Sequence, residues 1–162
     1  MNARCGLVGE HLSHSYSPRI HALLGEYPYD LIEVPREGLA AFFQRREFRA
    51  VNVTIPYKEL VIPLLDTVSD KARRIGAVNT VVQDAAGRLH GYNTDAYGFT
   101  EMMKWARIDV AGRKCLVLGS GGASKTVCAC LREMGAGDVI VISRRGRTIT
   151  AIWTAMLTRR CW

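Results

Sequence analysis

The chain has 162 residues and a formal net charge of +7, with 22 Lys and Arg against 15 Asp and Glu. Hydrophobic residues make up 48% and charged residues 23%, a globular composition that excludes disorder over most of the length. No apolar run approaches the ~20 residues of a membrane span, and the first residues lack the apolar core of a secretory signal. We therefore expect a cytoplasmic protein without a membrane partner.

The basic residues are spread along the chain. Part of the excess comes from Arg147 to Trp162, which holds three Arg and no acidic residue. Nucleic-acid-binding proteins show a concentrated basic patch, often interleaved with aromatic residues. We therefore expect no nucleic-acid partner and a modest positive field that suits a small anionic substrate.

Metal-ligating residues do not form a recognisable pattern. The five Cys are odd in number, and their spacing fits no zinc motif. His11 and His14 are separated by two residues in a predicted loop, without an acidic or Cys partner at ligand spacing. We expect buried thiols in a reducing compartment and no metal.

The first part of the chain alternates strands and helices. Ser17 and Pro18 are typical of an N-cap and a first helical residue, and Ser69 is a second expected N-cap. Asp84 to Gly87 is a predicted hairpin turn. We expect strands over residues 5–9, 29–34, 49–55, 77–83 and 88–92, and helices from Pro18 onward and over residues 38–47, 57–65, 69–75 and 95–107.

The character of the sequence changes near residues 110–113. KCLVL is a continuous apolar strand, GSGGASKT is a glycine-rich turn that opens a helix to Met134, and DVIVIS is a second strand. Together they predict one βαβ unit. A lone unit of this kind leaves sheet faces and an edge uncovered, which leaves self-association open.

The glycine-rich turn has the pattern of a phosphate-binding loop. Gly119, Gly121 and Gly122 let the main chain approach a pyrophosphate at a helix N-terminus. Ser143 and Arg144 stand at the end of the second strand, where an arginine suits the 2′-phosphate of NADP. Three alternatives stay open: a nucleotide-hydrolysing P-loop, for which Ser124 replaces the required Gly, a tight turn without a ligand, and arginines that are merely solvated.

Polar residues gather at predicted strand ends in the first part. Asn52 and Thr54 share one strand face, and Lys58 follows them. Further hydroxyl, amide and carboxylate groups come from SHSYSP, GAVNT and YNTD. Such groups could recognise a small polyhydroxylated acid, although each alone is as typical of a cap or a turn.

Five motifs in one order give these segments a common explanation. The stretches SHSYSP, VNVTIPYKE, IGAVNT, GYNTDAYGF and GSGGASKT resemble those of the shikimate dehydrogenase family, and the resemblance covers about residues 6–143. It implies an α/β fold with an N-terminal substrate-binding domain followed by a Rossmann-like NADP domain. For this chain we expect the first domain over residues 1–110, an incomplete Rossmann-like βαβ unit over 111–146, and an atypical tail over 147–162.

The resemblance also implies a role for each site residue. Lys58 would be the acid/base, with Asp95 beside it to orient it. NADP would be the cofactor, and shikimate or 3-dehydroshikimate the small-molecule substrate. The implied substrate-binding residues are Ser15, Ser17, Thr54, Lys58, Asn79 and Asp95, and the implied cofactor-binding residues are Gly119, Ser120, Gly121, Gly122, Ala123, Ser143 and Arg144.

The end of the sequence departs from the family pattern. After Gly146 there is no recognisable second half of the nucleotide domain and no helix that returns to the substrate domain. The resemblance therefore implies a truncated enzyme with weak or absent turnover, and an out-of-frame tail is one hypothesis for its origin. A non-catalytic fragment that at most binds shikimate, and a variant that also uses quinate, are the alternatives.

Overall fold

The computed structural model describes residues 4–143, and contacts divide the chain between Asp95 and Ala96 into two compact units. The predictions for Arg144 and for residues 147–162 lie outside the described residues. In the first unit the elements are β1 (Cys5–Gly9), α1 (Ser17–Leu24), β2 (Tyr29–Glu33), the 3₁₀ helix η1 (Arg36–Gly38), α2 (Leu39–Arg45), β3 (Ala50–Val53), the 3₁₀ helix η2 (Ile62–Leu64), β4 (Thr67–Val68), α3 (Asp70–Ile75), β5 (Thr80–Gln83) and β6 (Leu89–Tyr92). The remaining elements are α4 (Asp95–Trp105), β7 (Lys114–Leu118), α5 (Gly122–Glu133) and β8 (Asp138–Ile142).

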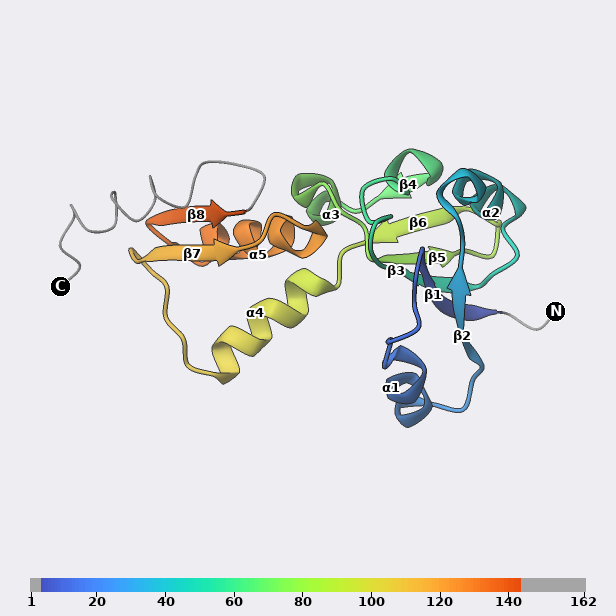
Figure 1. Cartoon of the computed structure of the whole chain (residues 1–162), viewed down its shortest axis with the longest axis horizontal. Coiled ribbons are helices and arrows are strands. Elements are labelled where there is room, and N and C mark those ends of the chain that lie inside the picture. Colours follow the sequence, from blue (N-terminus) through green and yellow to red (C-terminus); the bar gives the residue numbers. More distant parts are fainter. Residues whose placement is uncertain (1–3, 144–162) are drawn as a thin grey trace. The chain divides into compact units, whose positions relative to one another are not determined.

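The first unit is built on one six-stranded sheet with the order β2-β1-β3-β5-β6-β4 (Figure 1). β1 runs parallel to β2 and to β3, whereas β5 runs antiparallel to β3 and to β6. Because of this reversal, the carboxyl ends of β1 and β3 lie beside the amino end of β5. The expected polar segments follow the first two strands or precede the third, so the topology gathers them at one edge of the sheet.

An aromatic cluster fills the core on one face of this sheet. α2 turns Leu39, Phe42 and Phe43 inward, the three- and four-residue spacing expected of an amphipathic helix. The rings of Phe42 and Phe48 stack with centroids 5.4 Å apart, and Phe43 meets both edge-on. Val8 and other β-branched strand residues complete this core. The helix and the strands thus bury the faces that the sequence predicts.

The segment after β3 differs from the expected helix. Over residues 57–65 the chain forms consecutive turns and η2 in place of a regular α-helix. Pro63 has no N–H to donate and restricts the residue before it, so a helical hydrogen-bond ladder cannot run through it. One bond of helical spacing forms, from the Val61 N–H to the Tyr57 carbonyl at 3.0 Å. This irregular segment carries Lys58.

The first helix begins differently from the prediction. Ser17 is the first residue of α1, and Tyr16 occupies the cap position. The Ser15 hydroxyl accepts a hydrogen bond from the Ser17 N–H at 3.2 Å, which leaves the Ser17 side chain available for other contacts. Pro18 lies in the first turn as expected, and Ser69 caps α3 as expected by accepting from the Ala72 N–H.

The predicted hairpin is confirmed. β5 and β6 pair in antiparallel register, and the Gly87 N–H donates to the Asp84 carbonyl at 3.0 Å. Gly87 has a φ of 78°, a conformation that favours glycine. The Asp84 carboxylate accepts from the N–H groups of Ala86 and Arg88, each at 2.9 Å, and contacts His90 at 3.0 Å.

The second unit contains the predicted strand–helix–strand. β7 and β8 pair in parallel, and Met103 of α4 packs with Val117 of β7 and Leu131 of α5. The Cys130 thiol contacts the Ala96 carbonyl at 3.5 Å, so α4 belongs by its contacts to this unit. Whether the substrate-binding domain extends to residue 110 as a functional unit stays a prediction. None of the helices within residues 4–143 is long and apolar enough to cross a membrane.

Replacing Tyr57 by Phe tests the hydrogen bond that fixes the irregular segment in the core. Tyr57 is fully buried, and its hydroxyl donates to the Val34 carbonyl at 2.5 Å. We expect Tyr57→Phe to lower the free energy of unfolding by about 1–3 kcal/mol, because it leaves that carbonyl without its donor. Urea denaturation measures the loss. A Tyr97→Phe control, at a residue 72% exposed, should be neutral. Equal stability of both variants would contradict the expectation.

The hairpin carboxylates predict a loss of stability in acid. Hydrogen bonds from His90 and from the Arg88 N–H hold the pKa of Asp84 well below its ordinary value, and bonds from the Leu89 N–H and Arg46 lower the pKa of Asp66. A lowered folded-state pKa stabilises the fold above the unfolded pKa, about 3.9, and this contribution is lost as the pH falls below it. Urea midpoints between pH 6 and 3 should therefore fall less in Asp84→Asn than in the parent chain. Parallel pH profiles would refute this account.

Candidate functional site

The six expected substrate-binding residues come from four segments of the first unit. Two serines lie at the start of α1, Thr54 follows β3, and Lys58 lies in the irregular segment after it. Asn79 immediately precedes β5, and Asp95 begins α4. The topology places all of these segments at or near strand ends.

Lys58 and Asp95 form a direct ion pair. The Lys58 Nζ lies 2.6 Å from the Asp95 Oδ2. The lysine side chain is 14% exposed and the aspartate side chain 39% exposed. The Val78 N–H donates to the Lys58 carbonyl at 2.7 Å and anchors the main chain behind this side chain. A carboxylate at this distance orients the ammonium and leaves two of its three N–H groups for a substrate oxygen.

Asn79 is the most buried of the expected site residues, with 7% of its surface exposed. Its Oδ1 accepts from the Thr94 N–H at 2.8 Å and from the Thr80 hydroxyl at 3.0 Å. Its Nδ2 donates to the Thr94 hydroxyl at 3.0 Å, and its carbonyl accepts from the Val53 N–H at 2.8 Å. Asn79 therefore joins the start of β5 to Thr94, the residue that precedes Asp95.

The two serines form the second pair that the structure brings together. The Ser15 hydroxyl donates to the Ser17 hydroxyl at 3.1 Å, and both residues are partly exposed. Thr54 is partly buried, with its main-chain N–H donating to the Val8 carbonyl at 2.9 Å. Thr54 and Asn79 make their recorded hydrogen bonds with residues outside the expected substrate-binding set. The substrate role of all six stays a prediction.

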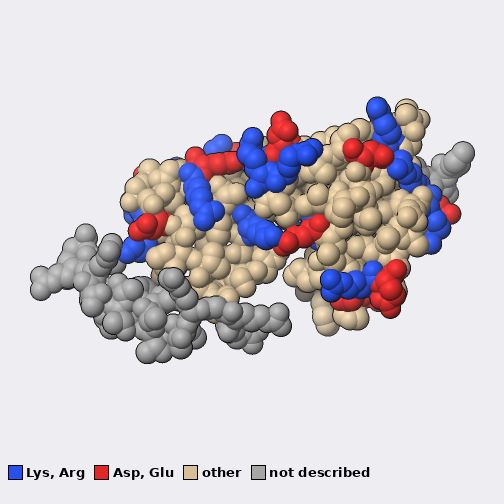
Figure 2. All heavy atoms as spheres, turned by 90° about the horizontal axis from the view of Figure 1, so that it is seen from above, with Lys and Arg blue, Asp and Glu red and all other residues tan. Residues whose placement is uncertain are grey.

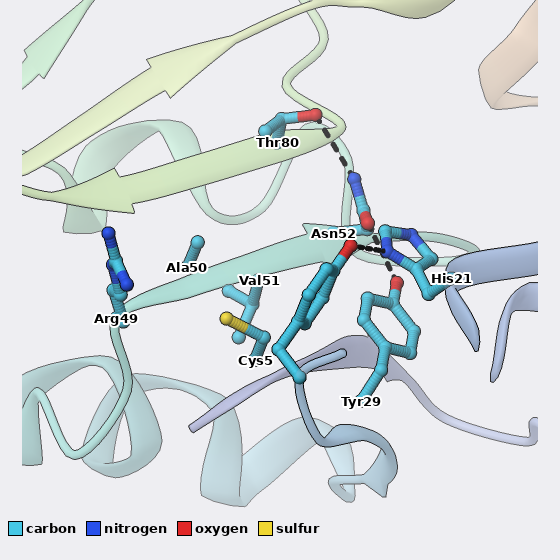
Figure 3. A pocket seen from close by; sticks show the side chains of 9 residues that line it. Cys5, His21, Tyr29, Arg49, Ala50, Val51, Asn52 and Thr80 are labelled. Atoms are coloured by element: carbon cyan, nitrogen blue, oxygen red, sulfur yellow. Dashed lines mark hydrogen bonds between the residues drawn. The ribbon is translucent and has the colours of Figure 1, made fainter. Parts of the chain in front are cut away.

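A chain of hydrogen bonds beside the site was not expected. The Tyr29 hydroxyl donates to the Asn52 Oδ1 at 2.7 Å, and the Asn52 Nδ2 donates to the Thr80 hydroxyl at 3.2 Å (Figure 3). Burial raises the pKa of Tyr29 to about 12, so its hydroxyl stays a donor at neutral pH. The sequence places Asn52 on the same strand face as Thr54. Tyr29 comes from β2, which is separated from β3 by β1, so the spacing of residues along the sequence does not predict its contact with Asn52.

The glycine-rich turn of the second unit leaves space above its main chain. Gly119 has a φ of 106°, a conformation that L-residues rarely adopt. A Cβ added at Gly119 or at Gly121 would meet no atom within 4 Å, so packing inside the described chain does not require glycine at either place. Gly121 is the N-cap of α5, and no side chain caps the helix. Main-chain N–H groups at an uncovered helix start fit a phosphate.

The other expected cofactor residues lie around this turn where the structure describes them. Gly122 and Ala123 form the first turn of α5, Ser120 precedes its cap, and Ser143 directly follows β8. The Gly119 N–H donates to the Ile142 carbonyl at 2.8 Å, which holds the turn against the end of β8. Ser143 is therefore next to the glycine-rich turn. Arg144 lies outside the described residues, and the cofactor role of the whole set stays a prediction.

Charged side chains mix on the surface. On the face drawn in Figure 2, Lys and Arg are interleaved with Asp and Glu, and no single basic patch covers it. Ion pairs include Arg4 with Asp30 at 3.0 Å and Lys104 with Glu101 at 2.8 Å. Over residues 4–143 no group of three or more His, Cys, Asp or Glu side chains could hold a metal ion, and the four cysteines form no disulfide.

The fold and these two sites define a class. An α/β unit that gathers polar side chains around an ion pair, followed by a glycine-rich βαβ unit, has the organisation of a dinucleotide-dependent oxidoreductase. Residues 7–81 match the family model described as the shikimate dehydrogenase substrate binding domain. The chain is similar to shikimate dehydrogenases over the part that it shares with its relatives.

Curated relatives and solved structures show the same similarity. The chain is 45% identical over 151 residues to the shikimate dehydrogenase (NADP(+)) of Carboxydothermus hydrogenoformans, covering 86% of this chain and 52% of the relative. It is 47% identical over 139 residues to that of Thermus thermophilus, covering 82% and 52%. A crystal structure of the Thermus thermophilus enzyme in complex with NADP(H) and shikimate superposes with a TM-score of 0.78 at 45% identity, covering 88% and 56%. The chain spans about half the length of the curated relatives it matches.

Asn79→Ala tests whether the carboxamide holds the strand ends together. We expect the free energy of unfolding to fall by about 1–3 kcal/mol, because the Thr94 N–H and its neighbours lose their acceptor. Asn79→Asp retains an oxygen at the same position and should lose less. Urea denaturation of both variants measures the free energy of unfolding. Equal losses would contradict the expectation that the acceptor oxygen at residue 79 stabilises the fold.

Proposed function

We propose that this chain carries the substrate-binding and NADP-binding parts of a cytoplasmic shikimate dehydrogenase, which reversibly reduces 3-dehydroshikimate to shikimate with NADPH. The observation that supports this most directly is the 2.6 Å contact between Lys58 and Asp95 in a chain that matches the family's substrate-binding domain. A mostly buried ammonium held by a carboxylate is suited to donate a proton to an oxygen atom.

Lys58 is the proton donor in this proposal. Bound NADPH supplies a hydride to the carbonyl carbon of the substrate. The Lys58 Nζ gives a proton to the carbonyl oxygen, so that the C=O group becomes H–C–OH, and the lysine recovers its proton from water. Asp95 keeps the Nζ pointed at that oxygen. In the oxidative direction the neutral lysine takes the proton back.

Hydroxyl and amide groups fit the substrate's chemistry. Shikimate carries three hydroxyls and a carboxylate, which require donors and acceptors at fixed positions. The Ser15 and Ser17 hydroxyls lie 3.1 Å apart and offer two adjacent hydroxyl groups. Thr54 adds a hydroxyl, and Asn79 positions the residues before Asp95. We propose that these residues orient the ring while Lys58 reaches its reacting oxygen.

The second unit fits the phosphates of NADP. Room above Gly119 and Gly121 and the uncapped start of α5 together accept a pyrophosphate. Ser120, Gly122 and Ala123 complete this cradle, and Ser143 with Arg144 would contact the 2′-phosphate. An arginine at this strand end favours NADP over NAD.

Lys58→Met tests the role of the lysine. We expect kcat for shikimate-dependent NADP⁺ reduction to fall by about 10²–10⁴-fold, the usual contribution of a positioned general acid or base. The matched control is Lys104→Met. Lys104 pairs with the Glu101 carboxylate near the end of α4, away from Asp95 at its start, so the substitution should leave kcat unchanged. Equal effects of both substitutions would contradict the assignment.

Binding is measured beside turnover, because the chain spans only about half the length of its relatives. Isothermal titration with shikimate should give one site that Lys58→Met weakens and Lys104→Met preserves. Titration with NADP⁺ should be sensitive to Gly121→Val, which fills the space above the turn. If the parent chain gave no heat of binding with either shikimate or NADP⁺, the proposal would be overturned, whatever the turnover.

A further inference from the structure

A cavity lies on the face of the main sheet that α1 borders. Its volume is about 460 Å³, within the range of small-molecule sites. The floor consists of Cys5, Ala50 and Val51, which are small or aliphatic, and Asn52 with Thr80 lines one side (Figure 3). Lys58 and Asp95 are not among its lining residues. The cavity therefore does not contain the proposed proton-transfer pair, although Tyr29, which lines it, is hydrogen-bonded to Ser17 of the proposed substrate-binding set.

One end of the cavity is aromatic. The rings of His21 and Tyr29 stack with centroids 3.7 Å apart at 12°, and Tyr27 meets His21 edge-on at 5.8 Å. A hydrogen bond of 2.5 Å between the Tyr27 hydroxyl and the His21 Nδ1 fixes this arrangement. Fixed rings beside an apolar floor present a surface for another flat ring.

The other end carries a positive charge. Arg49 stands across the floor from Tyr29 and His21 in Figure 3 and lines the cavity. Its neighbours Arg45 and Arg46 contact Glu47 and Asp66, whereas Arg49 has no recorded ion pair within residues 4–143. A guanidinium without a carboxylate partner favours an anionic group, and a carboxylate matches its paired donors.

We propose that this cavity binds a small aromatic carboxylate, with its ring against Tyr29 and His21 and its carboxylate at Arg49. The two ends demand both properties together: an uncharged ring leaves Arg49 unpaired, and an aliphatic acid leaves the aromatic face without a flat partner. Asn52 and Thr80 form hydrogen bonds with Tyr29, Asn79 and Thr94 and with each other, so they shape the wall more than they select the ligand.

The test uses naphthalene-2-carboxylate as the probe and naphthalene-2-carboxamide as its uncharged counterpart. Titration of the full chain, followed by the probe's fluorescence, should show the carboxylate binding at least tenfold more tightly than the carboxamide. Arg49→Gln should abolish that difference. Arg132→Gln, which removes an arginine from α5, is the matched control and should preserve it.

A second variant tests the cavity itself. Ala50 lies on the floor, and Ala50→Leu fills space there, so it should weaken both probes at least tenfold in a chain whose circular dichroism is unchanged. If that variant does not fold, Tyr29→Leu removes the stacking surface instead and should give the same loss.

Three results would overturn the proposal: no binding of the carboxylate by the parent chain, equal binding of the two probes, or unchanged binding in both cavity variants. Lys58→Met should bind the probe like the parent chain. Loss of probe binding in Lys58→Met would place the ligand in the substrate site and would also overturn the proposal. Because the probe titration uses neither shikimate nor NADP⁺, failure of the proposed catalytic function leaves this test intact.

Discussion

The reversal of strand direction between β3 and β5, beside which the Asn79 carbonyl accepts from the Val53 N–H, is the constraint on which the site depends. Parallel β1 and β3 deliver the serines, Thr54 and Lys58 to one edge of the sheet, but residues 79–95 reach that edge only because β5 starts there and β6 returns to it. Asn79 spends its carboxamide on Thr94 and Thr80. A buried amide that makes several hydrogen bonds favours one arrangement, because others would leave its polar atoms unpaired.

The geometry of the ion pair depends on the hydrogen bonds made by residues 78 and 79. Lys58 and Asp95 are 37 residues apart in sequence, and each lies on main chain anchored from behind. The Lys58 carbonyl is bound by the Val78 N–H, and Thr94 is bound by Asn79. The 2.6 Å contact is therefore positioned by residues 78 and 79, which directly precede β5. A site held in this way is preorganised, and little side-chain entropy remains to be lost when a substrate arrives.

The sequence predicted what depends on local pattern. Alternation and β-branching located the strands, the spacing of Leu39, Phe42 and Phe43 located α2, and the turn before Arg88 located the hairpin. Two local predictions were wrong: Pro63 interrupted an expected helix, and Tyr16 replaced Ser17 as a cap. The contact of Tyr29 with Asn52 could not be predicted, because it crosses strands whose order only the folded sheet defines. The motif residues Lys58 and Asp95 are paired here, although their spacing alone implies no contact.

Asp95 belongs both to the polar site and to α4, because its carboxylate pairs with Lys58 and it is the first residue of that helix. Its carboxylate holds Lys58 in the first unit, while Ala96 and Met103 of the same helix are buried among residues of the second. One charged residue of the polar site, Asp95, therefore lies on a helix whose apolar residues pack in the second unit. A chain cut between Asp95 and Ala96 would retain Lys58 in its first part. Asp95 would then be the last residue and would no longer be held by a helix. Any division of the chain between the two units that keeps the ion pair therefore has to leave α4 joined to Asp95, its first residue.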